Sequence, residues 1–136
     1  MENKKRCLYR KLDNDIREYV FTEASNAAVD EWIDWLDRIV IEDLIPEGST
    51  DRLLFDTRQS GPLPMYYTFK KLTEWRQKNQ PYDQNRYSRV AQLYNSNSFY
   101  VTMAKNLMKI FPMRDSKMEY FFNDRDAAVA WLLRGD

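Results

Sequence analysis

A polar segment follows a short apolar run near the middle of the chain, and its residue types could do chemistry. Leu53, Leu54 and Phe55 precede the segment Asp56-Thr57-Arg58-Gln59-Ser60-Gly61-Pro62. An aspartate at the end of a strand can accept a phosphoryl group or bind magnesium, but such sites need further carboxylates from other strand ends. An aspartate that faces solvent or braces the loop, paired with Arg58, is the simpler interpretation.

Ser60 offers a second kind of chemistry in the same segment. A phosphate on a serine at a helix N-terminus would meet free backbone N–H groups and a favourable helix dipole, with Arg58 nearby. A serine before glycine and proline is also ordinary turn or capping chemistry. Both interpretations stay open, and the candidate regulatory or interaction residues are Asp56, Thr57, Arg58, Ser60 and Tyr66.

Aromatic side chains form a second candidate site, a ligand cleft. Tyrosine and tryptophan are enriched at interfaces, and their rings hold flat or cationic ligands. The candidate cleft residues are Tyr67, Trp75, Tyr82 and Tyr87. The alternative is that they are single, partly exposed aromatic residues without a special role. Trp32 and Trp131 fall on apolar helical faces, so we expect both in the core.

The composition limits what these residues can do. The chain has no histidine, which is the commonest metal ligand and general base, and Cys7 is its single cysteine. We therefore expect no catalytic group, no metal site and no cofactor. An intramolecular disulfide is impossible, which suits a reducing compartment.

Charge and hydropathy bear on partners and location. Basic and acidic residues balance at 21 each, so the summed charge gives no general attraction to nucleic acid or to an anionic membrane. No apolar run approaches the roughly 18 residues that cross a bilayer, and the first residues lack the apolar core of a signal peptide. We expect a cytoplasmic protein with no nucleic-acid partner and no membrane insertion.

Apolar periodicity predicts one α/β domain over residues 1–136. Strands are expected at 7–12, 16–22, 52–56, 88–94 and 117–122, with a hairpin turn at 13–15. The run at 53–55 is apolar on both faces, which predicts a central strand covered on both sides. Helices are expected after Ser25 or Asn26, at 64–78, at 99–111 and at 127–133, the last capped by Asn123 or Asp124. The order predicts a mixed sheet of about five strands that opens with a hairpin, with about four helices packed on it.

The hairpin argues against a doubly wound nucleotide-binding domain. Such a domain begins with a parallel strand, helix and strand, and it carries a glycine-rich turn after its first strand. The chain has three glycines, at 48, 61 and 135, which cannot form either of the usual phosphate-binding loops.

The order of elements and several segments resemble the SpoIIAA-like branch of the STAS (anti-sigma factor antagonist) superfamily. The segments are EASNAAVDEWIDWL, DRLLFDTRQSG, SRVAQLY and above all the ending KMEYFFNDRDAAVAWLL. The resemblance implies a mixed sheet with helices mainly on one side and binding to another protein. In signalling members a serine at the start of the helix after the third strand is phosphorylated, and Ser60 is the nearest match. Their Asp-Ser-Ser-Gly motif is here the longer Asp56 to Gly61 segment.

Two functions remain open at this point. The first is a non-enzymatic protein-interaction or regulatory module that uses the Asp56 to Met65 junction, with an unidentified protein partner. The second is a small-molecule or lipid sensor whose cleft is walled by the aromatic segments. A homodimer fits either function, because exposed aromatic residues and edge strands can pair.

Overall fold

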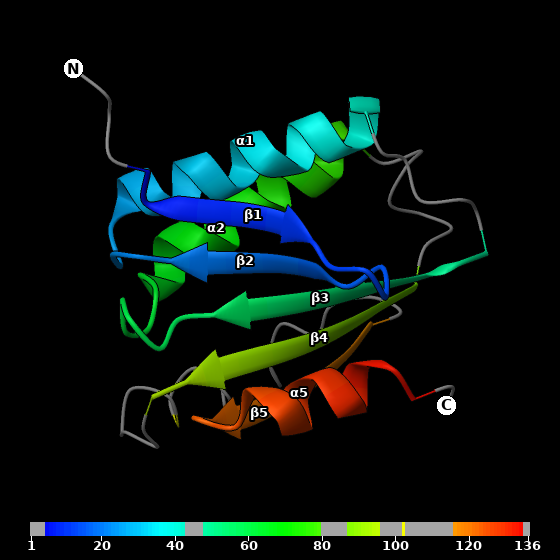
Figure 1. The fold of residues 1–136 in the computed structure, drawn as a ribbon. Helices are drawn as coiled ribbons and strands as arrows, with labels where there is room; N and C mark the ends of the chain where they lie inside the picture. The colour runs from blue at the N-terminus through cyan, green and yellow to red at the C-terminus, as the bar shows by residue number, and fades with distance from the viewer. Residues whose placement is uncertain (1–4, 43–47, 80–86, 96–101, 103–115, 135–136) are drawn as a thin grey trace.

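The structure, a computed structural model, describes residues 5–42, 48–79, 87–95, 102 and 116–134 (Figure 1). Its strands are β1 (Cys7–Lys11), β2 (Arg17–Phe21), β3 (Thr50–Asp56), β4 (Tyr87–Tyr94) and β5 (Ser116–Phe122). Its helices are α1 (Asn26–Glu42), α2 (Met65–Lys78) and α5 (Arg125–Leu132). Helices and strands alternate from α1 to β4, as the sequence predicts, and α5 follows β5.

All five strands lie in one sheet, in the order β1-β2-β3-β4-β5. β1 pairs with β2 antiparallel, and every later pair of neighbours is parallel. The predicted mixed sheet that opens with a hairpin is therefore confirmed. The described residues contain three helices rather than the expected four, and the predicted helix at 99–111 lies outside them except for Thr102.

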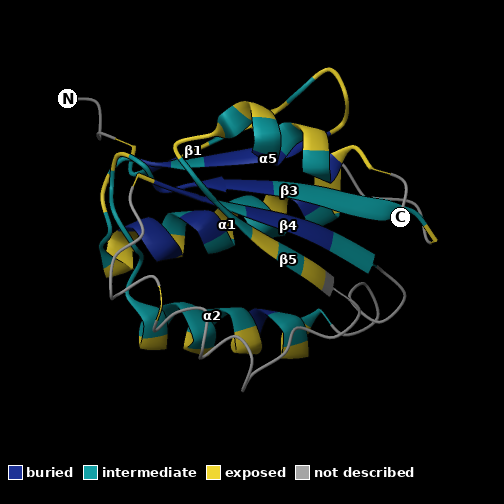
Figure 2. Ribbon diagram, turned by 90° about the horizontal axis from the view of Figure 1, so that it is seen from below, coloured by how far each residue is buried: buried dark blue, intermediate teal, exposed yellow. Residues whose placement is uncertain are grey.

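Helices cover both faces of the sheet. Figure 2 shows α1 and α2 on one side and α5 on the other. Successive side chains of a strand point to opposite faces, so in β3 Phe55 packs in the cluster under α1 while Leu54 packs in the cluster under α5. This confirms the prediction that residues 53–55 belong to a central strand covered on both sides.

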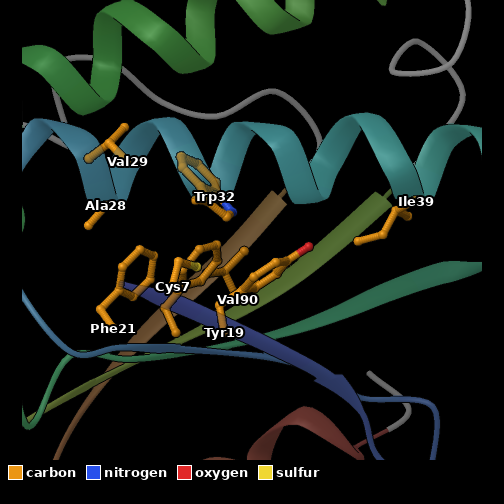
Figure 3. Close-up of a cluster of buried hydrophobic side chains, with 9 residues drawn as sticks. Cys7, Tyr19, Phe21, Ala28, Val29, Trp32, Ile39 and Val90 are labelled. Carbon is orange, nitrogen blue, oxygen red and sulfur yellow. The ribbon is translucent and has the colours of Figure 1, made fainter. Parts of the chain in front are cut away.

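The larger core lies between α1 and the sheet (Figure 3). Tyr19 stacks on Phe55 with 5.2 Å between ring centroids, and Trp32 of α1 meets Phe55 edge-on at 5.3 Å. The predicted burial of Trp32 is confirmed, since 5% of the residue is exposed. Among the described residues, the buried Tyr19 hydroxyl and Trp32 indole N–H have no hydrogen-bond partner. This core is therefore held by aromatic packing, and it carries a desolvation cost for those two groups.

Side-chain oxygens start two of the helices. The Ser25 hydroxyl accepts a hydrogen bond of 3.1 Å from the Ala28 backbone N–H at the start of α1. The Asp124 carboxylate accepts one of 3.0 Å from the Ala127 N–H at the start of α5. Both bonds satisfy backbone donors that have no partner within the first turn, and both confirm predicted caps.

Two arginines of the sheet hold the last turn of α5. Arg89 donates to the Trp131 carbonyl oxygen at 2.7 Å, and Arg52 donates to the Leu132 carbonyl oxygen at 2.7 Å. The Arg89 guanidinium also lies 4.0 Å above the Trp131 ring. Trp131 is half-buried and packs against the core cluster under α5, so it lies at the border of the core and not inside it. Its ring covers a charged strand residue and contacts Phe121.

Candidate functional site

Four strand ends meet on one side of the sheet, which we call the carboxyl edge. β2, β3, β4 and β5 are parallel, so all four end at this edge. In Figure 1 it lies at the left, where the arrows of β2, β3 and β4 point. Ligands of open α/β sheets bind in the crevice outside the carboxyl ends of the strands. The segment that follows Asp56 lies at this edge, so the predicted regulatory residues lie just beyond the carboxyl end of β3.

Asp56 braces the loop that follows β3. Its carboxylate accepts hydrogen bonds from the Arg58 backbone N–H at 3.1 Å, from Nε at 3.0 Å and from Nη2 at 2.9 Å. The hydrogen bonds to Asp56 raise the pKa of the Arg58 guanidinium above its usual value. Asp56 is buried, which favours the loop-bracing interpretation over an aspartate that faces solvent, and the expected pairing with Arg58 is present.

Thr57 and Arg58 tie the same loop to β4. The Thr57 backbone N–H and hydroxyl both donate to the Leu93 carbonyl oxygen, at 2.9 and 3.2 Å. The Asn95 side-chain amide donates to the Arg58 carbonyl oxygen at 3.1 Å. Thr57 is buried, so its hydroxyl serves the structure and is shielded from modification in the folded chain.

Ser60 lies in a turn and does not cap α2. Its hydroxyl donates to the Gly61 carbonyl oxygen at 2.8 Å, and α2 begins only at Met65, after Pro64 in the N-cap position without a side-chain cap bond. Gly61 has φ +80°, a conformation that favours glycine, and its N–H bonds to the Thr57 carbonyl oxygen. Of turn and cap, the structure therefore shows the turn, because the residues up to Pro64 separate Ser60 from the start of α2.

Tyr66 stands out from this edge. It occupies the first turn of α2 and is 83% exposed, although most of the residues from Arg58 to Met65 are half-buried. A large aromatic side chain held in solvent on a braced segment is the kind of group that another protein can bind.

The structure places the candidate cleft residues apart. Trp75 is buried and donates its indole N–H to the Asp37 carboxylate of α1 at 2.9 Å. The Tyr67 hydroxyl donates to Asp30 of α1 at 2.6 Å, and this bond raises the pKa of the tyrosine. These two side chains join α2 to α1. Tyr87 begins β4 at the opposite edge of the sheet, and Tyr82 lies outside the described residues.

A charged cluster on the face of the sheet that α5 covers was missed by the sequence analysis. The Glu18 carboxylate of β2 is 2% exposed and accepts from Arg10 Nε at 2.6 Å and from Arg125 Nη2 at 2.8 Å. It faces α5, on the opposite side of the strand from Tyr19. The sequence did offer a sign of it, because a glutamate stands within the β-favouring run from Ile16 to Phe21. A charged side chain in a buried strand is usually paired with an opposite charge.

The described residues bring no metal site together. Within the part of the chain that the structure describes, no three cysteine, aspartate or glutamate side chains are grouped so that they could hold a metal ion. In the same residues, no helix has the length and apolar character needed to cross a membrane.

Comparison with known proteins identifies no relative of this chain. No family model matches its sequence, and neither a curated protein nor a solved structure matches it.

Proposed function

We propose that the chain is a cytoplasmic protein-interaction module of the SpoIIAA-like type, without enzymatic activity, whose contact surface is centred on Tyr66. The observation that carries the proposal is the 83% exposure of Tyr66 at the start of α2. Exposed tyrosine anchors supply a large share of the energy of protein interfaces, because they combine apolar area with a hydroxyl.

The loop before α2 supports this proposal by its rigidity. Asp56 holds Arg58 through three hydrogen bonds, and Thr57 is bonded to β4. A braced surface loses little conformational entropy when it binds, so a modest contact area can give useful affinity. The mixed sheet with its opening hairpin is also of the kind that the family resemblance implies.

Recovery of partners from the host organism tests the proposal. The tagged chain, Tyr66→Ala and the control Ile41→Ala would each be isolated and the bound proteins quantified. Ile41 is 82% exposed but lies near the end of α1, away from the carboxyl edge, so it matches Tyr66 in exposure and differs in place.

The expected result is one protein retained by the wild type and by Ile41→Ala, and recovered about tenfold less with Tyr66→Ala, as for loss of an interface anchor. Equal recovery with all three chains, each shown to be folded, would place the contact elsewhere and end the proposal for this surface.

A further inference from the structure

β1 is the first strand in the order of the sheet and pairs with β2 on one side only. Such a strand directs a row of backbone N–H and C=O groups away from its neighbour, and a strand of another chain can pair with them. We call the side of β1 that faces away from β2 the free edge. The sheet could be extended there by a second copy or by an extended peptide.

The hydrogen bonds of the hairpin show which residues face the free edge. Leu12 donates to the Ile16 carbonyl oxygen at 2.8 Å, and Thr22 donates to the Arg6 carbonyl oxygen at 2.9 Å. Every second residue of an antiparallel strand forms both its hydrogen bonds with its neighbour, and the residues between direct theirs outward. Cys7, the first residue of β1, therefore directs its backbone N–H and C=O to the free edge.

Two side chains of α1 occupy both of these Cys7 groups. The Glu31 carboxylate accepts a hydrogen bond of 3.2 Å from the Cys7 N–H, and the Trp35 indole N–H donates one of 2.9 Å to the Cys7 carbonyl oxygen. Glu31 and Trp35 are four positions apart in the helix, so both reach the strand from the same face of α1. Figure 1 shows α1 beside β1 at this side of the sheet.

Further contacts hold the two side chains in these positions. Glu31 accepts from the Arg6 backbone N–H at 2.8 Å and pairs with the Arg6 guanidinium at 3.1 Å. The Trp35 ring packs on Tyr9 with 5.2 Å between ring centroids, and the Arg38 guanidinium lies 4.9 Å from the Trp35 ring centroid. Neither side chain can leave Cys7 without losing these contacts as well.

Hydrogen bonding alone is a weak reason for this arrangement. Water can satisfy backbone groups at an exposed strand edge. A carboxylate and an indole do more than water, because an incoming strand would have to displace them from the two groups that it needs for pairing. Displacing the carboxylate is the costlier step, since hydrogen bonds to an ionised acceptor are roughly twice as strong as neutral ones.

We propose that Glu31 and Trp35 close the free edge of β1 at Cys7 and keep another strand from extending the sheet there. The basic side chains of Arg10 and Lys11 in the same strand act in the same direction, because charged residues are common on protected edges. The folded chain then forms no dimer through paired β1 strands. This proposal does not depend on the Tyr66 surface.

Hydrogen exchange of the Cys7 backbone amide, followed by NMR in the intact chain, tests the role of the carboxylate. Glu31→Ala removes the acceptor and is expected to raise the exchange rate about tenfold, the effect of losing one hydrogen bond. Glu31→Gln is the matched control: it removes the charge but keeps an acceptor oxygen, so its rate should stay within about threefold of wild type. Equal rates in all three chains would overturn the proposal.

Strand addition is tested with a fluorescent synthetic peptide, Thr-Val-Glu-Val-Glu-Val-Thr, whose extended backbone can pair and whose carboxylates suit the basic strand. Anisotropy would measure its binding to the double variant Glu31→Ala/Trp35→Phe and to Asp34→Ala, an exposed α1 position that loses the same charge. The double variant is expected to bind about tenfold more tightly, with NMR shifts of the amides at residues 7–11. Equal binding to both folded chains, or binding to neither, would overturn the proposal.

Trp35→Phe alone decides the question if the double variant fails to fold. Phenylalanine keeps an aromatic ring beside Tyr9 and removes only the indole donor. Peptide binding that is about threefold tighter than in wild type would support the proposal, and binding equal to that of wild type would overturn it.

Discussion

Asp56 determines the shape of the loop before α2, because three donors of Arg58 depend on its carboxylate. Asp56→Ala is expected to lower the free energy of unfolding by about 1 to 3 kcal/mol, the usual effect of removing a buried acceptor. Urea denaturation followed by tryptophan fluorescence would measure the change. Asp34→Ala, at an exposed position of α1, is the control and should stay within about 0.5 kcal/mol of wild type.

A change as small as that of the control would mean that the loop keeps its shape without the carboxylate.

The sequence predicts the Asp56 and Arg58 pair because the two residues are neighbours along the chain. It cannot predict that Glu18 joins Arg125, since that contact depends on the packing of α5 against β2.

Cys7 shows how burial affects a titrating group. Burial, and then the charge of Glu31, raise the pKa of its thiol from 9.0 to about 12. The unfolded chain releases this proton at lower pH than the folded chain, so stability is lost as pH rises from about 9 toward about 12.

Measuring the unfolding free energy of wild type and Cys7→Ala against pH isolates the thiol. The advantage of the wild type should stay constant up to about pH 8 and then fall by up to about 1.4 kcal/mol per pH unit. Iodoacetamide should label the native thiol far more slowly than the urea-unfolded one. A constant difference through pH 10, or fast native labelling, would contradict the burial of Cys7.

At the scale of elements, the contact between α1 and α2 rests on Trp75. Its ring is buried and its N–H bonds to Asp37. Trp75→Ala should cost about 3 to 5 kcal/mol in unfolding free energy, the usual loss for a buried aromatic ring, while Trp75→Phe should cost only about 1 to 2 kcal/mol.

Tyr67→Phe serves as the control for this contact. It removes a hydrogen bond to Asp30 that lies in solvent, so its effect should be within about 0.5 kcal/mol. Thermal and urea unfolding of the three variants would measure these costs. A small loss for Trp75→Ala would show that α2 is held mainly by other contacts.

The strongest local signals predicted the elements well. Ser25 and Asp124 begin their helices as expected, because a cap depends on residues only three positions apart. Ser60 was harder to place, since glycine and two prolines after it allowed either a turn or a helix start. Trp131 could not be placed from its helical face alone, because Arg89 of β4 occupies the position beneath its ring.

For the whole molecule, alternation of strands and helices predicts the mixed sheet and its hairpin, since chain order limits how strands can be connected. The contact between Glu18 and Arg125 joins residues 107 positions apart, and only the fold brings them together.

Photo-crosslinking in the host organism tests the central claim, that Tyr66 meets another protein. A benzophenone amino acid would replace Tyr66 in one variant and Ile41 in the control. The account predicts a single adduct with another protein at position 66 and none at position 41, and a product of twice the chain's mass would identify the partner as a second copy. Folded protein that gives no adduct at position 66, or the same adducts at both positions, would contradict the account.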